Sequence, residues 1–122
     1  GRRIPAIVQP WDLTTTILDA FGIPKPDGLW GSSLLPLAAG KSRRGRDAAV
    51  LGTPINTQVM TPEWMYCVWR GQGEAVLYDL VKDPNQTRNV VRKYPDVACE
   101  MRGFADEHLA MQGMGDQARE YT

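Results

Sequence analysis

The sequence predicts an α+β fold, in which a small four-stranded antiparallel sheet packs against a C-terminal amphipathic helix and a helical segment precedes both. Three observations support this fold class. Residues 13–21 show a helical apolar period, residues 48–80 contain four short β-prone runs separated by turn residues, and residues 96–111 show a second helical period. A chain of 122 residues with 43% hydrophobic content suffices for one small domain with a modest core.

The first helix is predicted from apolar residues that recur on one helical face. They are Leu13, Ile17, Ala20 and Phe21. Asp12 precedes them and is able to accept amides of the first turn, while Gly22 is suited to the position that follows a helix end. A shorter helix is predicted over 34–39, with Ser33 as its cap and Gly40 as its stop.

The sheet is predicted from the runs 48–53, 58–61, 64–70 and 75–80, which short loops connect and which are therefore most simply antiparallel. The third run is apolar on both faces. Trp64, Tyr66 and Val68 form one row, and Met65, Cys67 and Trp69 form the other. One helix covers only one face, so the other face requires a further layer, either a missing domain or the N-terminal segment 4–39.

The C-terminal helix is predicted over 96–111. Pro95 and Asp96 are suited to its first turn. The residues expected on its apolar face are Val97, Met101, Phe104, Ala105 and His108. Residues 113–122 mix glycine with charged residues and are expected to fray or to adopt a conformation that depends on a neighbour.

The segment 77–89 carries the most specific pattern in the chain. An apolar strand ends at Asp83 and Pro84, because proline fixes φ for a turn and the preceding aspartate bonds nearby amides. This segment resembles the L-Y-D-L-x-x-D-P-x-E-x-x-N-L signature found near the C-terminus of sulfatases. Gln86 replaces the usual Glu and Val90 the usual Leu.

Two further segments resemble the same family in the same order. Residues 12–22 are similar to its D-L-x-P-T-x-L-D-x-x-G helix, with Thr15 in place of the proline, and residues 31–40 are similar to its G-x-S-L-L-P-L-L-x-G element. The resemblance implies that residues 1–46 form a helical segment packing on a parent catalytic domain and ending in the solvated basic linker 41–46. Residues 47–122 would then form the C-terminal α+β subdomain of a sulfatase.

The resemblance implies a structural role for the residues of the shared motifs. These are Asp12, Gly22, Leu77, Tyr78, Asp79, Asp83, Pro84 and Asn89. The polar loop 53–58 is the candidate for the rim of a substrate cleft, through Asn56, Thr57 and Gln58, because loops on a rigid scaffold often carry specificity. An ordinary connector is the alternative for this loop.

Catalytic and metal-binding residues are not assigned within this chain. Neither Cys67 nor Cys99 lies in the C-x-P-S-R type of motif whose cysteine becomes formylglycine in sulfatases, and the acidic residues are scattered rather than clustered for a hard cation. His108 is the only histidine. The resemblance implies that calcium or another divalent metal, together with formylglycine, belongs to a missing N-terminal catalytic domain. The chain, which opens with Gly1, is interpreted as a fragment that is not catalytic alone.

Two other interpretations remain open at this stage. The same region of a related phosphonate or phosphate ester hydrolase would show these motifs, and a stand-alone binding or interaction module could use Trp11, Trp30, Trp64 and Trp69 as a platform. The charges balance, so no nucleic-acid partner is indicated, and no apolar run is long enough for a membrane span. Two free thiols and self-association through an exposed sheet face are expected.

Overall fold

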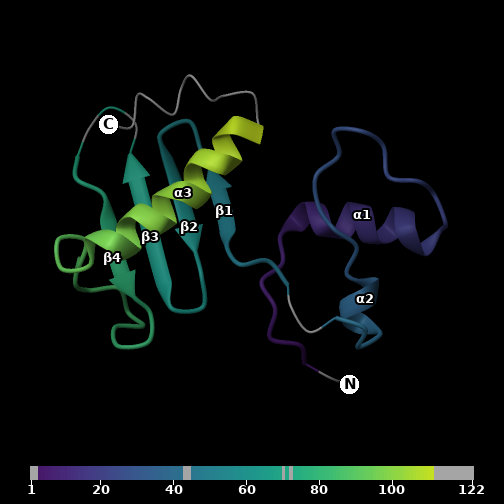
Figure 1. Cartoon of the computed structure of the whole chain (residues 1–122), viewed down its shortest axis with the longest axis horizontal. Helices are drawn as coiled ribbons and strands as arrows, with labels where there is room; N and C mark the ends of the chain where they lie inside the picture. The colour runs from purple at the N-terminus through teal and green to yellow at the C-terminus, as the bar shows by residue number, and fades with distance from the viewer. Residues whose placement is uncertain (1–2, 43–44, 70, 72, 112–122) are drawn as a thin grey trace. The chain divides into compact units, whose positions relative to one another are not determined.

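The computed structural model describes residues 3–42, 45–69, 71 and 73–111, and the chain divides into two compact units, Gly1–Asp47 and Ala48–Thr122. The predictions for Arg43, Arg44 and residues 113–122 lie outside the described residues. Among the described residues, no helix has the length and apolarity needed to cross a membrane. The elements, shown in Figure 1, are α1 (Pro10–Ala20), α2 (Leu35–Ala38), β1 (Ala49–Gly52), β2 (Asn56–Met60), β3 (Trp64–Trp69), β4 (Val76–Asp79) and α3 (Pro95–Met111).

The predicted α+β class is confirmed. The second unit is a four-stranded antiparallel meander in the order β1-β2-β3-β4, followed by α3 (Figure 1). β2 begins at Asn56, two residues before the predicted start. The reason is a tight hairpin turn, in which the Thr53 amide donates to the Asn56 carbonyl at 2.8 Å and the Asn56 amide donates to the Thr53 hydroxyl at 3.0 Å.

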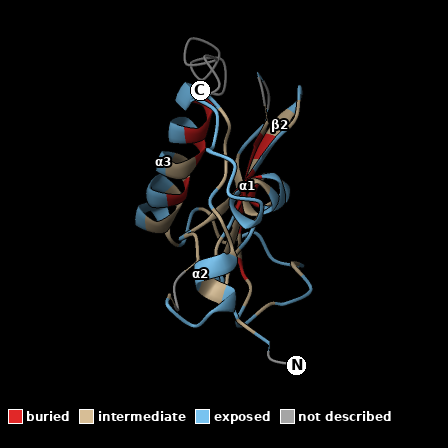
Figure 2. Ribbon diagram, turned by 90° about the vertical axis from the view of Figure 1, so that its right-hand side faces the viewer, coloured by how far each residue is buried: buried red, intermediate tan, exposed pale blue. Residues whose placement is uncertain are grey.

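The core of this unit lies between the sheet and α3. Val50, Val59, Tyr66 and Leu77 are paired across the four strands and therefore share one face. They pack with the residues that α3 buries, Met101, Ala105 and Leu109. Figure 2 shows the buried side of α3 turned toward the sheet. The row Trp64, Tyr66 and Val68 is thus the covered row of β3.

The opposite face of the sheet carries the second row, Met65, Cys67 and Trp69. No element of the second unit covers this face in the part of the chain that the structure describes. Leu51 and Met60, which belong to the same face, are 57% and 44% exposed. Cys67 is buried among its neighbours, Cys99 is exposed, and both are free thiols.

His108 gives the second unit a predictable dependence on pH. Its ring is buried beside Gly52, and desolvation lowers its pKa below the ordinary value of 6.5, because burial disfavours the imidazolium. The unfolded chain binds this proton more readily, so the free energy of unfolding should be highest above pH 6.5 and should fall as the pH drops below it.

Urea titrations at pH 7.5 and pH 5.5 would measure this effect. His108 is the only histidine of the chain, so His108→Gln should remove most of the difference between the two pH values. Equal stability of the unsubstituted protein at both values would contradict the prediction.

The first unit contains α1 and α2, and α1 differs from its predicted form. It begins at Pro10, with Gln9 as the N-cap and Asp12 in the third helical position, because proline fits the first turn and the Asp12 carboxylate reaches back to the Gln9 amide. Gly22, at φ +66°, follows the helix end as predicted.

The apolar pattern of α1 does not face a core within the described residues. The helix buries Asp12 and Thr15 instead. Leu13, Ile17 and Phe21 are 59%, 58% and 78% exposed. The apolar period predicted the helix correctly, but it marks a surface that the described residues of the first unit leave uncovered.

The second helix is one turn long. Leu34 rather than Ser33 takes the N-cap position, although the Ser33 hydroxyl still accepts the Leu35 amide at 3.2 Å. Gly40, at φ +73°, ends the helix as predicted.

Candidate functional site

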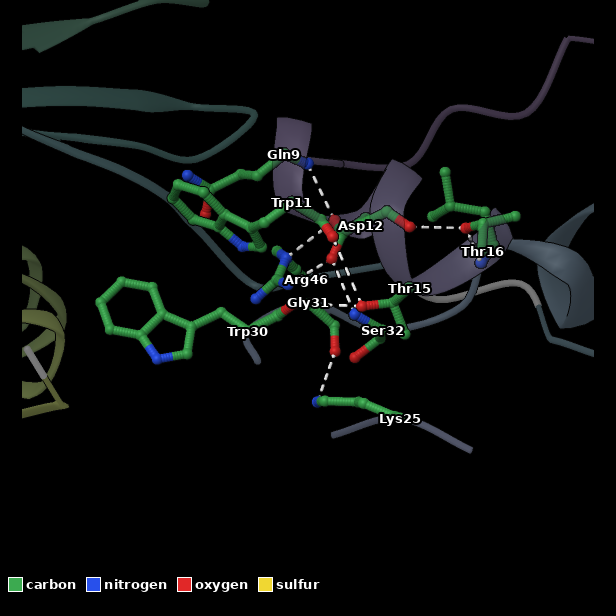
Figure 3. A network of polar contacts seen from close by, with 11 residues as sticks. Gln9, Trp11, Asp12, Thr15, Thr16, Lys25, Trp30, Gly31, Ser32 and Arg46 are labelled. Atoms are coloured by element: carbon green, nitrogen blue, oxygen red, sulfur yellow. Dashed lines mark hydrogen bonds and ion pairs between the residues drawn. The ribbon is translucent and has the colours of Figure 1, made fainter. Parts of the chain in front are cut away.

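A buried carboxylate organises the first unit. Asp12 is 2% exposed and accepts the backbone amides of Gln9 and Ser32 at 2.8 and 2.9 Å (Figure 3). Arg46 donates Nε to Oδ2 at 3.1 Å and Nη2 to Oδ1, which makes a two-point ion pair. The two oxygens of Asp12 therefore accept four donors and have little capacity left to act as a base or a metal ligand.

The loop that reaches Asp12 depends on Gly31. This residue has φ +102°, and a Cβ at its position would collide with the Trp11 carbonyl and lie 2.9 Å from the Thr15 hydroxyl. The close approach lets the Thr15 hydroxyl donate to the Trp30 carbonyl at 3.0 Å. Lys25 Nζ donates to the Gly31 carbonyl at 2.9 Å (Figure 3), so the loop is held from both sides.

Thr15 and Thr16 extend this network. Thr16 donates its hydroxyl to the Asp12 carbonyl at 2.6 Å and accepts the Leu34 amide at 2.9 Å. Thr15 stands where the sulfatase motif has proline, and its hydroxyl supplies a bond to the Trp30 carbonyl that proline has no group to make. The hydroxyl of Thr15 thus stabilises the neighbouring loop at the position where the motif has proline.

The charge of Asp12 is stabilised within the fold. Burial alone would raise the pKa of its carboxyl, but the hydrogen bonds from Arg46, Gln9 and Ser32 outweigh burial and lower that pKa below 3.8. Arg46 was expected in a solvated linker, and that expectation is wrong for this residue, because its side chain pairs with Asp12 and is only 31% exposed.

A hollow of about 280 Å³ adjoins the network and is bordered by Asp12, Arg46 and the hydroxyl-bearing Ser32, Ser33 and Ser42. Its one cation and one carboxylate neutralise each other through the ion pair. Among the described residues that border the hollow, no uncompensated charge is therefore left for a ligand.

In the second unit, the motif residues of β4 and the following turn also hold the backbone. Leu77 is fully buried, whereas Tyr78 is half-buried and belongs to the sheet face opposite α3. The buried Asp79 carboxylate accepts the Val81 and Lys82 amides at 3.2 and 3.0 Å. Lys82 Nζ approaches the same carboxylate at 3.2 Å.

Asp83 and Asn89 close the turn that follows. The Asp83 carboxylate accepts the amides of Thr87 and Arg88, each at 2.8 Å, after the exposed Pro84. Asn89 Oδ1 accepts the Leu77 amide at 3.0 Å, and its Nδ2 donates to the Ala75 carbonyl at 3.3 Å. Asn89 thus replaces ladder bonds at the edge of β4 and Asp83 holds the turn, which accounts for their place in the motif.

The three candidates for a substrate rim lie in β2 rather than in a loop. Thr57 is fully buried on the α3 side, whereas Gln58 belongs to the opposite face. Asn56 is half-buried, and its side chain bonds the Thr53 hydroxyl at 3.1 Å. The strand alternation thus places Asn56 and Gln58 on the face opposite α3 and separates Thr57 from both of them.

Sequence reasoning missed Arg46, Ser32 and Thr16 as partners of the motif aspartate. Asp12 and Arg46 are 34 positions apart, and no local spacing signals such a pair. Within the described residues, no group of three or more His, Cys, Asp or Glu side chains is arranged to hold a metal ion.

The fold defined by these two units recurs in sulfatase structures. One solved structure, in complex with its substrate D-glucosamine-2-N,6-O-disulfate, matches 88% of this chain and 25% of its own with a TM-score of 0.72 and 20% identity. A 2-O GAG sulfatase matches 81% of this chain and 24% of its own with a TM-score of 0.68 and 25% identity. No family model matches the sequence.

Curated proteins of the same class match at the level of sequence. Arylsulfatase K of Homo sapiens is 29% identical over 83% of this chain, and that of Gallus gallus is 34% identical over 78%. The Delta 4,5-hexuronate-2-O-sulfatase of Bacteroides thetaiotaomicron is 29% identical over 84%. The chain is thus related to the sulfatases, and the predicted resemblance to their C-terminal region is confirmed. It spans 21 to 24% of the length of these relatives.

Proposed function

We propose that this chain is the C-terminal region of a sulfuric ester hydrolase and that it supports a catalytic domain without performing chemistry itself. The polar side chains of its motifs are occupied by bonds to backbone groups. The Asp12 carboxylate is saturated by four donors, and Asp79, Asp83 and Asn89 hold the β4 turn. On this proposal, the chain alone has no sulfatase activity.

The observation that carries the proposal is uncovered apolar surface on both units. In the first unit, Leu13, Ile17 and Phe21 recur on one side of α1 and are exposed. In the second unit, Leu51 and Met60 are exposed on the sheet face opposite α3. Apolar surfaces of this kind usually mark an interface. A chain that spans less than a quarter of its relatives' length has a natural occupant for both surfaces, the rest of the hydrolase.

The metal and the nucleophile belong to that missing part in this proposal. Calcium or another hard divalent metal is usually bound by six or more oxygen ligands. Formylglycine requires a cysteine in a motif of the C-x-P-S-R type. Cys67 is buried and its pKa is raised by desolvation, which disfavours the reactive thiolate. The described residues therefore suit a supporting role.

The two alternative functions have less support. Trp64 packs against Tyr94, with ring centroids 5.2 Å apart, and it belongs to the core side of the sheet rather than to a platform. Trp11 and Trp30 contact each other edge to face at 6.0 Å. The sulfatase names of the relatives favour a sulfate ester over a phosphonate or phosphate ester as the parent's substrate. A rim role for Asn56, Thr57 and Gln58 stays a prediction.

A dye-binding experiment tests the proposal. The 122-residue chain should bind a hydrophobic dye or self-associate, and Leu51→Glu combined with Met60→Glu should reduce both, because the two charges interrupt the uncovered face. The matched control combines Ile55→Glu with Val81→Glu, which are 67% and 71% exposed and lie in turns. A monomeric chain that binds no dye, or equal effects of the two double variants, would contradict the proposal.

A further inference from the structure

A second hollow lies on the unit that carries the sheet. Its volume is about 260 Å³, and it is bordered by Glu74 and by the turn from Arg88 to Lys93 that leads into α3. Three cations, Arg88, Arg92 and Lys93, stand around it with a single carboxylate. We call these four side chains the basic groove.

The charges of the basic groove are only partly compensated. Arg92 donates Nε and its terminal nitrogen to the two Glu74 oxygens at 2.7 and 3.0 Å, which neutralises one cation. In the described part of the chain, no acidic side chain pairs with Arg88 or Lys93, and both are exposed. Arg88 and Lys93 therefore carry the uncompensated positive charge at the edge of the hollow, although Lys93 Nζ also lies over the Tyr94 ring, 5.2 Å from its centroid.

The backbone under the basic groove is fixed. The Val90 amide donates to the Leu77 carbonyl at 2.8 Å, and Asn89 bonds both the Leu77 amide and the Ala75 carbonyl. The Lys93 amide donates to the Val90 carbonyl at 2.9 Å. Since the turn is tied to the fully buried Leu77, the available cations project from a rigid base, which lowers the entropic cost of holding a ligand.

We propose that the basic groove binds a sulfate group of a sulfated oligosaccharide. The choice of a sulfated sugar rests on the proposed function, whereas the anion site rests on Arg88 and Lys93. Arginine presents a planar fork that matches a tetrahedral oxyanion, and the lysine adds a second point charge. Two cations and a hollow of this size suit one sulfate group on a sugar better than the long phosphate backbone of a nucleic acid.

Binding of a heparin-derived hexasaccharide to the 122-residue chain would test the site. We expect binding that weakens with added salt, because the interacting charges are exposed. Arg88→Gln combined with Lys93→Gln should weaken binding about tenfold, as expected when two exposed ionic interactions are removed together. The matched control, Arg3→Gln combined with Lys41→Gln, removes the same charge from exposed positions of the other unit and should leave the affinity unchanged.

Glu74→Gln should act in the opposite direction. It removes the carboxylate that competes with the ligand for Arg92, so the hexasaccharide should bind about threefold more tightly, as expected for one exposed ion pair. The side chains of Arg88 and Lys93 are both exposed, so the thermal midpoint of the Arg88→Gln, Lys93→Gln double variant should equal that of the unsubstituted chain.

Three results would overturn the proposal. They are absence of hexasaccharide binding by the unsubstituted chain, an equal loss of affinity in the two double variants, and equal affinity for the desulfated hexasaccharide or for a short single-stranded oligonucleotide. The chain binds or fails to bind this probe whether or not a catalytic domain docks on it. The test is therefore independent of the dye experiment, and the failure of one proposal is distinguishable from the failure of the other.

Discussion

Truncation of Leu77 to alanine is expected to lower the free energy of unfolding of the sheet unit by about 2 to 5 kcal/mol, the range for a buried leucine that leaves a cavity. Leu77 is 0% exposed and is paired with Tyr66 on the face that α3 covers. Its amide and carbonyl also anchor Asn89 and Val90, so the turn after β4 cannot collapse freely into the space left by the side chain.

The measurement for Leu77→Ala is amide hydrogen exchange of β3 and α3 together with a urea titration. Exchange is useful because it reports on this unit alone. Val81→Ala is the matched control, since Val81 is 71% exposed, and it should change the free energy of unfolding by less than about 0.5 kcal/mol. If Leu77→Ala and Val81→Ala lowered the free energy of unfolding by similar amounts, Leu77 would not belong to the core.

Replacement of Asp12 by alanine is expected to lower the free energy of unfolding of the first unit by about 3 kcal/mol, at the lower end of the range for breaking a buried ion pair. The lower end applies because the Arg46 side chain is 31% exposed and can be partly solvated once its partner is lost. The amides of Gln9 and Ser32 lose their acceptor in the same variant.

Hydrogen exchange of the α1 amides measures the effect of Asp12→Ala. Asp19→Ala is the control on the same helix, because Asp19 is exposed, and it should have little effect. Arg46→Ala should also destabilise the first unit, and the double variant should cost less than the sum of the two single changes, because both remove one interaction. Full additivity would argue against a direct coupling between Asp12 and Arg46.

Much of the second unit was predictable because its signals are local. The alternation of residues in β3, the stop at Asp83 and Pro84 and the helical period of α3 each depend on residues close in the sequence. Their predicted bounds lie close to the observed ones. The sulfatase motifs were recognisable in the sequence because they are also local: each is a short turn or helix end with fixed spacing.

The candidate sites were less predictable because they combine distant residues. Arg46 reaches Asp12 across 34 positions, and Glu74 pairs with Arg92 across 18. Thr57 is adjacent to Asn56 and Gln58 in the sequence but lies on the other face of β2, because the tight hairpin turn starts the strand early. Adjacency in the chain therefore gave a poor guide to adjacency in space.

The sequence by itself determined the α+β class, the antiparallel strand order and the family resemblance, because periodicity and turn chemistry act over a few residues. Only the tertiary structure decided which row of β3 faces α3, since both rows are apolar and local pattern cannot rank them. It also decided that α1 buries Asp12 and Thr15 and exposes Leu13, Ile17 and Phe21. A helical period identifies an apolar face, but what covers that face depends on which other surfaces are present.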